Sequence, residues 1–578
     1  MLRAVLLAAL LAAAAANVVR VADRDDLVAD VADVADEDAD RYRVPDGMLW
    51  GAGVSALQTE GAWDADGKAE SVADHVIFKG NLPTYTVNHA IAADSYHRFK
   101  EDVAAAKQLK LKMYKFSISW ARVLPEANAL KPNPAGVQFY HNLIDEIIKA
   151  GMTPVVTMYH FDHPQILEDQ FKGWQSREMV YKFAEYSKFI FDEYASKVPI
   201  FVTINEPNMY CAYFTAQFVA AGFRTEAEVD PYQCIHNNIL AHQAAYQFYQ
   251  QGVKAGKWNG KVGYSTLLMQ TNPATSNPED VYATDIFNQL HAGTSLAPVV
   301  YGDYPQSIKT LLGDKLPKFT DVEKRDLVDS TDFIGLNIYF SLSASYNRFM
   351  NSTSSGVMSM VLGQMTNDIP FIDVAMNVPG GGSPMAAFTT INPSTIRDAL
   401  LWTWKSYQKP IVITENGYGD MMGMGLHDKT RAAYFSAYLR SLVTTVKDYG
   451  VQVLAYSAWS LLDSFEFSGG YSRPFGLVHI DYEGQTLDRA IKDSSSFWTQ
   501  LAETNVVPYV ENPADASTTA APTKPPTKPP TNPPTTDRTT PKSGTTQAPV
   551  STTQRNSAAT ATVTALPLAL LAWLLLAR

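Results

Sequence analysis

The sequence IVITENG at residues 411–417 is the clearest indication of the fold, because it combines the pattern of a buried strand with a polar end. Three β-branched apolar residues precede a polar segment that contains Glu415, an order that predicts a strand ending in a turn. The sequence FVTINEP at residues 201–207 repeats this order and carries Glu206. The carboxyl ends of parallel strands meet at one edge of a sheet, so we expect the two glutamates to converge on one pocket.

Two carboxyl groups on one pocket indicate a particular chemistry. Hydrolysis of a glycosidic bond needs one carboxylic acid that donates a proton, and a second carboxylate that acts as the nucleophile or as the base that activates water. Either glutamate alone is better interpreted as a strand-end residue in a salt bridge. As a pair, Glu206 and Glu415 are predicted catalytic residues.

Short apolar runs alternate with segments of helical period through most of the chain, which predicts an α/β fold with a parallel sheet. The helical segments between the strands end at glycines such as Gly151 and Gly450. Eight alternations fit one closed (β/α)8 TIM barrel better than an open doubly wound sheet. The eight expected strands contain residues 49–51, 114–118, 154–159, 201–205, 261–268, 333–339, 411–415 and 453–459.

Composition and charge narrow the class of function. The chain has 578 residues, of which 46% are hydrophobic, and this is enough for a large core. Its formal net charge of −12 argues against nucleic acid as a partner, because phosphate binding needs clustered Lys and Arg. The only two cysteines, Cys211 and Cys234, can pair in an oxidising compartment or remain two buried thiols. No metal site is predicted, because His160 and His163 lack an evident third ligand.

The two ends of the chain differ in composition from the barrel, which we expect at residues 42–512. Residues 1–16 resemble a secretory signal peptide, and residues 17–41 form an acidic low-complexity segment. Residues 513–556 are rich in Thr and Pro, which predicts an extended stalk. Residues 557–578 have the order of a GPI-attachment signal.

The alternative for the C-terminal tail is a short membrane helix, but its apolar run is below the roughly 20 residues that span a bilayer. The sequence therefore predicts a protein of the secretory pathway that is anchored by GPI at the cell surface, with simple secretion as the alternative. Asn351 begins a sequon for N-glycosylation.

Seven motifs follow one another in an order that resembles one enzyme family. They are QTEGAW at 58–63, FSISW at 116–120, YHFD at 159–162, TINEP at 203–207, DFIGLN at 332–337, ITENG at 413–417 and WSLLD at 459–463. Together they resemble glycoside hydrolase family 1, the β-glucosidase family, over about residues 44–501. The resemblance implies a (β/α)8 barrel, small β-glycosides as substrates, net retention of anomeric configuration and no cofactor. Combined with the terminal signals, it suggests a secreted member of animal type.

The resemblance also implies roles for individual residues. Glu206 matches the general acid/base of the family, and Glu415 matches the nucleophile that forms a covalent glycosyl-enzyme. Lys115 and Asn337 match the surroundings of the nucleophile, and Tyr339 matches a tyrosine that holds it. The other expected substrate-binding residues are Gln58, His160, Asn205, Trp459, Glu466 and Phe467.

Three positions depart from the family's pattern. Lys115 stands where the family usually has Arg, and it keeps the charge but lacks the planar fork of two donors. Phe161 replaces a frequent Trp, which we interpret as a packing change. Phe467 also replaces a usual Trp and so lacks an indole N–H for a sugar hydroxyl.

Three functions fit these motifs. The first is a retaining β-glucosidase-like enzyme that acts on small O-linked β-glycosides. The second is a β-thioglucosidase or another specialised β-glycosidase of the same family. The third, from another class, is a catalytically weak sugar-binding surface protein, which the departures at Lys115 and Phe467 favour and the two retained glutamates oppose.

Overall fold

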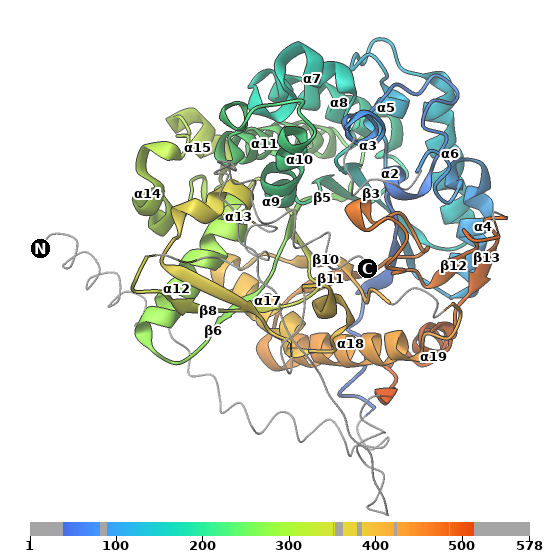
Figure 1. Ribbon diagram of the computed structural model, residues 1–578. Helices are drawn as coiled ribbons and strands as arrows, with labels where there is room; N and C mark the ends of the chain where they lie inside the picture. The colour runs from blue at the N-terminus through green and yellow to red at the C-terminus, as the bar shows by residue number, and fades with distance from the viewer. Residues whose placement is uncertain are drawn as a thin grey trace, which may run out of the picture. The chain divides into compact units, whose positions relative to one another are not determined.

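Eight parallel strands form a closed barrel in the order β1-β11-β10-β7-β5-β4-β3-β2 (Figure 1). The computed structural model describes residues 39–80, 89–350, 352, 362–378, 384–420, 425–484 and 486–513. The barrel strands are β1 Leu49–Gly53, β2 Met113–Ser117, β3 Thr153–Tyr159, β4 Ile200–Ile204, β5 Lys261–Leu267, β7 Phe333–Asn337, β10 Ile411–Asn416 and β11 Val453–Trp459. Each of the eight expected strands is one of these, so the predicted fold class is confirmed.

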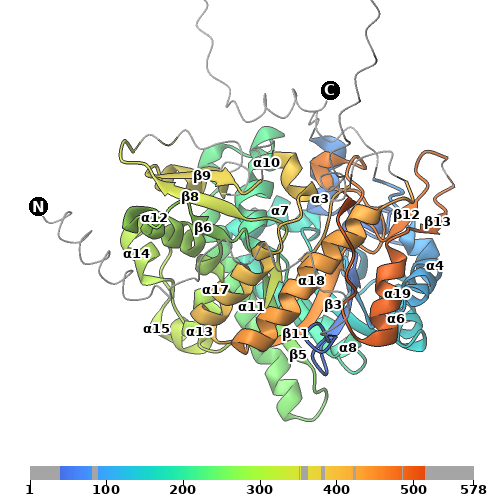
Figure 2. The ribbon, with the colours of Figure 1, turned by 90° about the horizontal axis from the view of Figure 1, so that it is seen from below.

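A helix follows each strand and covers the outside of the barrel, as Figure 2 shows from the side. In α6, the residues Phe139, Tyr140, Leu143, Ile144 and Ile147 are all buried, as expected for one apolar face. The covering helices are α4 Ser95–Gln108, α6 Pro134–Lys149, α8 Glu178–Tyr194, α11 Pro231–Lys254, α13 Thr294–Tyr301, α15 Asp321–Leu327, α17 Ser394–Tyr407, α18 Lys429–Tyr449 and α19 Ser495–Thr504.

Gly151 and Gly450 lie just beyond the ends of α6 and α18, with φ of +85° and +68°. A left-handed backbone at these positions ends a helix at little cost only in glycine, which confirms the helix ends expected from the sequence.

Shorter elements lie in the connections, many of them at the carboxyl ends of the strands. Two small sheets, β6-β8-β9 and β12-β13, were not expected from the sequence. The strands are β6 Thr271–Pro273, β8 Leu342–Tyr346, β9 Ile372–Met376, β12 Val478–Ile480 and β13 Arg489–Ile491. The short helices include α2 Ala56–Thr59, α3 Val72–Lys79, α5 Trp120–Val123, α7 Gln165–Phe171, α9 Pro207–Met209, the π-helix η3 Tyr210–Phe214, α10 Thr215–Ala220, α12 Pro278–Asn288, α14 Gln306–Leu312 and η9 Phe467–Gly469.

The barrel interior is filled by one layer of apolar side chains below the polar end. These are Met113, Val155, Val202, Phe333, Val412 and Ala455, each from a different strand. Side chains alternate between the two faces of a strand, so Ile411 and Ile413 pack outward against the helices while Val412 points inward. This packed layer supports the polar residues at the carboxyl ends of the strands.

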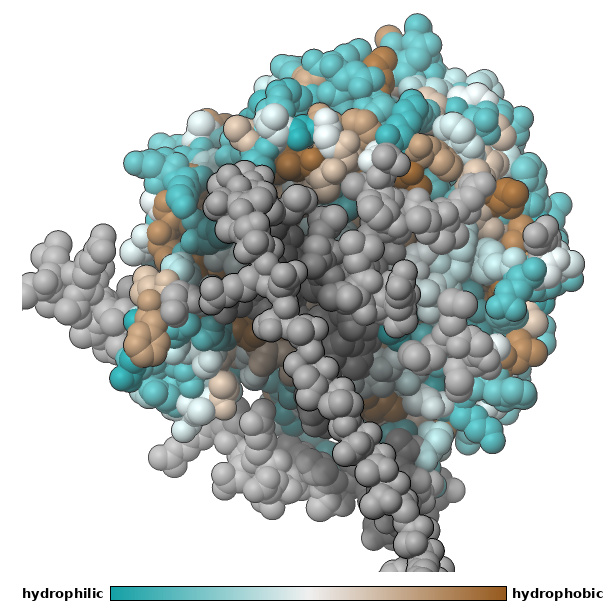
Figure 3. All heavy atoms as spheres, in the orientation of Figure 1, coloured by the Kyte–Doolittle hydropathy of each residue, from teal (hydrophilic) through white to brown (hydrophobic). Residues whose placement is uncertain are grey.

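The predicted signal peptide, most of the acidic segment, the stalk, the C-terminal tail and Asn351 lie outside the described residues. Within the described part of the chain, no helix has both the length and the apolar character needed to cross a bilayer. The face drawn in Figure 3 is mainly hydrophilic where it is coloured, with scattered apolar side chains.

Candidate active site

Glu206 lies just beyond β4 and is 8% exposed. Its backbone has φ +43° and ψ +57°, the left-handed region, which is unfavourable for a residue with a side chain. The N–H of Glu206 donates to Ser265 O at 3.1 Å, and Asn337 Nδ2 donates to Glu206 Oε1 at 2.6 Å. The carboxyl group is therefore held at the carboxyl end of β4 by neighbouring strands.

Glu415 lies within β10 and is 4% exposed. Lys115 Nζ donates to Glu415 Oε1 at 3.0 Å, and Tyr339 Oη donates to Glu415 Oε2 at 2.9 Å. An ammonium and a phenol on the two oxygens stabilise an ionised carboxylate. The structure therefore brings together Lys115, Tyr339 and Glu415, which the family resemblance grouped.

A β-bulge in β10 determines where Glu415 points. The register of β10 shifts between Ile413 and Glu415 against β7, and between Ile413 and Asn416 against β11. Thr414 and Glu415 both contact residues inside the barrel, whereas Asn416 bonds outward to Tyr434 of α18. Strict alternation would direct Glu415 outward, so the bulge aims it into the barrel.

Asn337 links the two glutamates. In the register of β7 with β10 it is the partner of Glu415, while its side-chain amide donates to Glu206 and, at 3.2 Å, to Asn205 Oδ1. The family resemblance placed Asn337 in the surroundings of Glu415 only. Glu206 and Glu415 therefore lie on either side of one residue of β7, at the same end of the barrel.

The electrostatic surroundings of Glu206 favour its protonated form. Burial and then the negative charge of Glu415 raise the pKa of Glu206 to about 8, against the opposing effects of the Asn337 hydrogen bond and Lys115. At neutral pH Glu206 can therefore hold the proton that a general acid donates.

Gln58, Trp459 and Glu466 form one hydrogen-bonded group. Burial and the Glu415 charge raise the pKa of Glu466 to about 8, although hydrogen bonds from Ser464, Trp459 and Gln58 favour its ionised form. Gln58 Nε2 also donates to Phe465 O at 2.8 Å. Amide, indole and carboxyl groups in one place can donate to and accept from the hydroxyls of a sugar.

His160 and Asn205 lie beside this group. Asn205 Nδ2 is 3.5 Å from His160 Nε2, and the His160 ring stacks on Trp459 with centroids 6.0 Å apart. Burial, together with the charge of Lys115, lowers the pKa of His160 well below its ordinary value, so its ring is neutral. Trp459 also lies over Lys115, whose Nζ is 5.6 Å from the ring centroid. The structure thus connects His160 and Trp459 to the surroundings of Glu415.

Phe467 lies in an aromatic cluster with Phe161 and Phe214. The centroid of Phe214 is 4.7 Å from that of Phe161 and 5.1 Å from that of Phe467. Phe161 is buried, which agrees with its interpretation as a packing residue. The two Phe-for-Trp departures, far apart in the sequence, both contact Phe214 and also contact one another, with centroids 6.2 Å apart.

Two residues that contribute polar contacts to the site, Ser464 and Thr414, are not among the site residues expected from the sequence. Ser464 Oγ donates to Glu466 Oε1 at 2.9 Å. Thr414 Oγ1 donates to Asn337 Oδ1 at 2.6 Å and lies 2.8 Å from Ser265 Oγ, which orients the amide that donates to Glu206. Thr414 belongs to the ITENG motif, and alternation from Val412 directs it inward, but no local pattern shows that it contacts Asn337 and Ser265 there.

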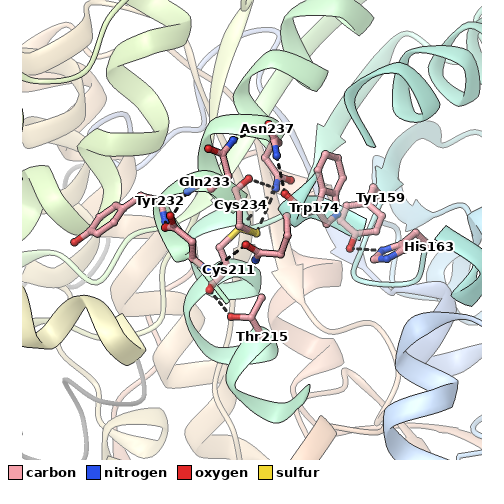
Figure 4. The surroundings of a disulfide bond; sticks show 12 residues. Tyr159, His163, Trp174, Cys211, Thr215, Tyr232, Gln233, Cys234 and Asn237 are labelled. Atoms are coloured by element: carbon pink, nitrogen blue, oxygen red, sulfur yellow. Dashed lines mark hydrogen bonds between the residues drawn. A yellow bond between two sulfur atoms is a disulfide. The ribbon is translucent and has the colours of Figure 1, made fainter. Parts of the chain in front are cut away.

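Cys211 and Cys234 form a disulfide, with Cα atoms 5.6 Å apart (Figure 4). The sequence left open whether the two cysteines form a disulfide or remain buried thiols, and the structure has the disulfide. The bond joins the π-helix η3 to α11.

Metal ligands are not gathered at this site. His163 Nε2 lies 2.8 Å from Glu168 Oε1 and its Nδ1 lies 3.0 Å from Tyr159 Oη, so both ring nitrogens have protein partners. Over the ranges that the structure describes, no group of three or more His, Cys, Asp and Glu side chains is placed to hold a metal ion.

Comparison with known proteins gives the family. The sequence model of glycosyl hydrolase family 1 matches residues 40–507. Among curated relatives, "Beta-glucosidase 11" of Arabidopsis thaliana is 34% identical over 495 residues, covering 80% of this chain and 92% of the relative. A "Cyanidin 3-O-glucoside 7-O-glucosyltransferase (acyl-glucose)" of Delphinium grandiflorum is 34% identical over 473 residues, covering 79% of this chain and 89% of the relative.

A solved structure of a rice β-glucosidase, in a covalent complex with glucose, has a TM-score of 0.71 and 30% identity, covering 79% of this chain and 98% of that chain. The protein belongs to glycosyl hydrolase family 1. It is a β-glucosidase-like glycoside hydrolase, and the retaining mechanism is typical of its family.

Proposed function

We propose that Glu206 is the general acid/base and Glu415 the nucleophile of this retaining β-glucosidase-like enzyme. The observation that carries the proposal is the difference in surroundings: Glu415 contacts the Lys115 ammonium, whereas Glu206 is buried beside a neutral amide and its pKa is raised to about 8. Opposite protonation states on two neighbouring carboxyl groups are what the two roles require.

In the first step, a Glu415 oxygen attacks the anomeric carbon as Glu206 donates its proton to the departing glycosidic oxygen. The bond to the aglycone breaks and an ester between the sugar and Glu415 forms. In the second step, ionised Glu206 takes a proton from water, whose oxygen attacks the anomeric carbon and releases the sugar and the Glu415 carboxylate. Each step inverts the anomeric centre, so the product keeps the configuration of the substrate.

We further propose that Gln58, His160, Asn205, Trp459 and Glu466 bind the glycone. Their contacts with one another, with the aromatic Phe467 alongside, support this role. Trp459 can stack on an apolar sugar face, while the amide, imidazole and carboxyl groups bond to hydroxyls.

A covalent intermediate tests the assignment of the nucleophile. The enzyme is mixed with 2,4-dinitrophenyl β-glucoside and quenched in acid during turnover. We expect a mass increase of one glucosyl residue on the peptide that contains Glu415. Glu415→Gln serves as the control and should lack the adduct. An adduct on another peptide would contradict the assignment.

The preference of the enzyme for a particular glycone and aglycone stays a prediction. A raised pKa on the acid favours O-glycosides, because an alkoxide leaving group needs a proton far more than a thiolate does. Rates on aryl β-glucoside, β-galactoside, β-fucoside and β-thioglucoside substrates would separate the specialised alternatives. The transferase activity in the name of the Delphinium relative makes acceptor alcohols worth including, because an alcohol can replace water in the second step.

We also propose that the protein enters the secretory pathway and is held at the cell surface by GPI. The disulfide supports an oxidising compartment, and the signals at residues 1–16 and 557–578 support entry and anchoring. A phosphatidylinositol-specific phospholipase should release the active enzyme from membranes. Release by detergent alone would point to a membrane helix instead, and activity only in the medium would point to simple secretion. The animal type of the enzyme stays a prediction from these signals.

A further inference from the structure

We propose that the Cys211–Cys234 disulfide is a positioning element for Glu206, which holds the segment beginning at this glutamate so that its proton reaches the leaving-group oxygen. This inference rests on the proposed role of Glu206 as general acid/base. The two cysteines touch no reacting atom and act only through the backbone that carries Glu206.

The first reason is the backbone of Glu206 itself. A glutamate in the left-handed region, with φ +43°, persists only where the surrounding structure holds it there. β4 ends at Ile204, so Glu206 lies outside the strand, and the chain after it must turn at once into α9. Ser265 and Asn337 hold Glu206 from the side of the barrel, and the position of its carboxyl group depends in addition on the conformation of the next residues in the chain.

The second reason is that the segment after Glu206 is irregular. Tyr210 N–H donates to Glu206 O at 2.9 Å, so α9 starts from the glutamate. The segment then passes from α9 into the π-helix η3 and on into α10. π-helical turns are rare and are weakly favoured by the backbone, so such a segment needs tertiary restraints to keep one shape. Cys211 lies in η3, in the first helical turn after α9.

The third reason is the rigidity of the anchor. Cys234 belongs to α11, a helix of 24 residues that packs on the outside of the barrel. Both cysteines are fully buried. Asn238 Nδ2 of α11 donates to Cys234 O at 2.8 Å and lies 3.6 Å from Cys211 Sγ, so this side chain contacts both ends of the disulfide. The disulfide therefore ties the irregular segment to a regular element.

The test compares two substrates that differ in their need for an acid. A 2,4-dinitrophenolate leaves without a proton, whereas an alkoxide such as methoxide does not. The value of kcat/KM reports only the steps up to the covalent intermediate, so it isolates proton donation to the leaving group. In Cys211→Ala/Cys234→Ala we expect kcat/KM to fall at least about tenfold for methyl β-glucoside, and less than about twofold for 2,4-dinitrophenyl β-glucoside.

A control variant separates positioning from general stability. Leu501 is buried in α19, which belongs to the wall of the barrel opposite β4. Leu501→Ala should lower the melting temperature and affect both substrates equally. Equal losses on both substrates in the cysteine variant, or no loss on either, would overturn the inference.

Two further measurements keep the test decisive. If the double alanine variant does not fold, Cys211→Ser/Cys234→Ser is made instead, because serine removes the bond but is close to cysteine in size, and both side chains are fully buried. The same two substrates are assayed, with the same expected difference. Glu206→Gln is assayed on the same two substrates. If its loss of kcat/KM does not depend on the leaving group, the proposed role of Glu206 fails. If it does depend on the leaving group, but the loss after removal of the disulfide does not, only this inference is overturned.

Discussion

Glu206 and Glu415 are the same residue type at the ends of two strands of one barrel, but their surroundings differ in charge. Glu415 accepts hydrogen bonds from an ammonium and a phenol, whereas Glu206 accepts one from the neutral amide of Asn337 and lies near the charge of Glu415. Identical side chains can therefore take opposite roles, because the neighbours decide which of them holds a proton. Substitutions and pH changes that alter this difference should have effects that range from the loss of catalysis to a small change in KM.

Replacement of the nucleophile should have the largest effect. Glu415→Gln removes the attacking oxygen anion while keeping the shape of the side chain, and we expect kcat on aryl β-glucosides to fall by about 10⁴-fold or more. Melting temperature is measured in parallel. A folded variant that retains substantial activity would show that the two glutamates do not differ as proposed.

Replacement of the acid should depend on the substrate. Glu206→Gln is expected to reduce kcat/KM on alkyl β-glucosides by about 10²- to 10⁴-fold, the range for general acid catalysis, and far less on 2,4-dinitrophenyl β-glucoside. Azide, which needs no base, should accelerate the second step in this variant and give a β-glucosyl azide. Equal losses on both substrates would assign Glu206 a structural role.

Loss of the cation beside Glu415 should have a moderate effect. Lys115→Met removes a hydrogen bond from a charged donor, worth about 1.5–3 kcal/mol, so we expect kcat/KM to fall by about 10- to 100-fold. Lys115→Arg keeps the charge and can restore the fork of two donors, so it should stay close to the wild-type value. Steady-state kinetics of both variants measure the difference, and equal loss in the two would exclude charge as its cause.

The pH dependence reports the raised pKa of Glu206. The acid must be protonated to act, so activity should be retained below pH 8 and lost as the pH rises through about 8, the pKa to which burial and Glu415 raise this group. The decline should approach tenfold per pH unit in kcat/KM for an alkyl β-glucoside. In Glu206→Gln this decline should disappear. A basic limb near pH 5 would contradict the effect of burial.

The smallest expected effect lies at the edge of the glycone site. Phe467→Trp adds an indole N–H that can donate to a sugar hydroxyl, so we expect KM for a β-glucoside to fall by about threefold to tenfold, the value of one net hydrogen bond. Phe467→Leu, which adds no donor, should not lower KM. Unchanged kinetics in the tryptophan variant would remove this explanation of the departure at Phe467.

The aromatic cluster of Phe161, Phe214 and Phe467 shows what local sequence patterns cannot predict. Phe161 and Phe467 each stand out in the sequence as a replacement for Trp, but Phe214, which contacts both, has no local signal that marks it. Contacts between residues far apart in the chain depend on how the loops return over the barrel. Likewise, the open choice between a disulfide and two thiols needed the distance between η3 and α11.

The eight strands, their alternation with the helices and the two glutamates at strand ends can be predicted from the sequence, because periodicity and turn residues act within a few neighbours. Three features of the site depend on the folded barrel: a β-bulge turns Glu415 inward, Asn337 donates to Glu206, and a disulfide ties the segment after Glu206 to α11. These features cannot be read from local patterns, because the direction and charge environment of a side chain come from partners on other strands and helices. Their distance in space is fixed only when the barrel closes.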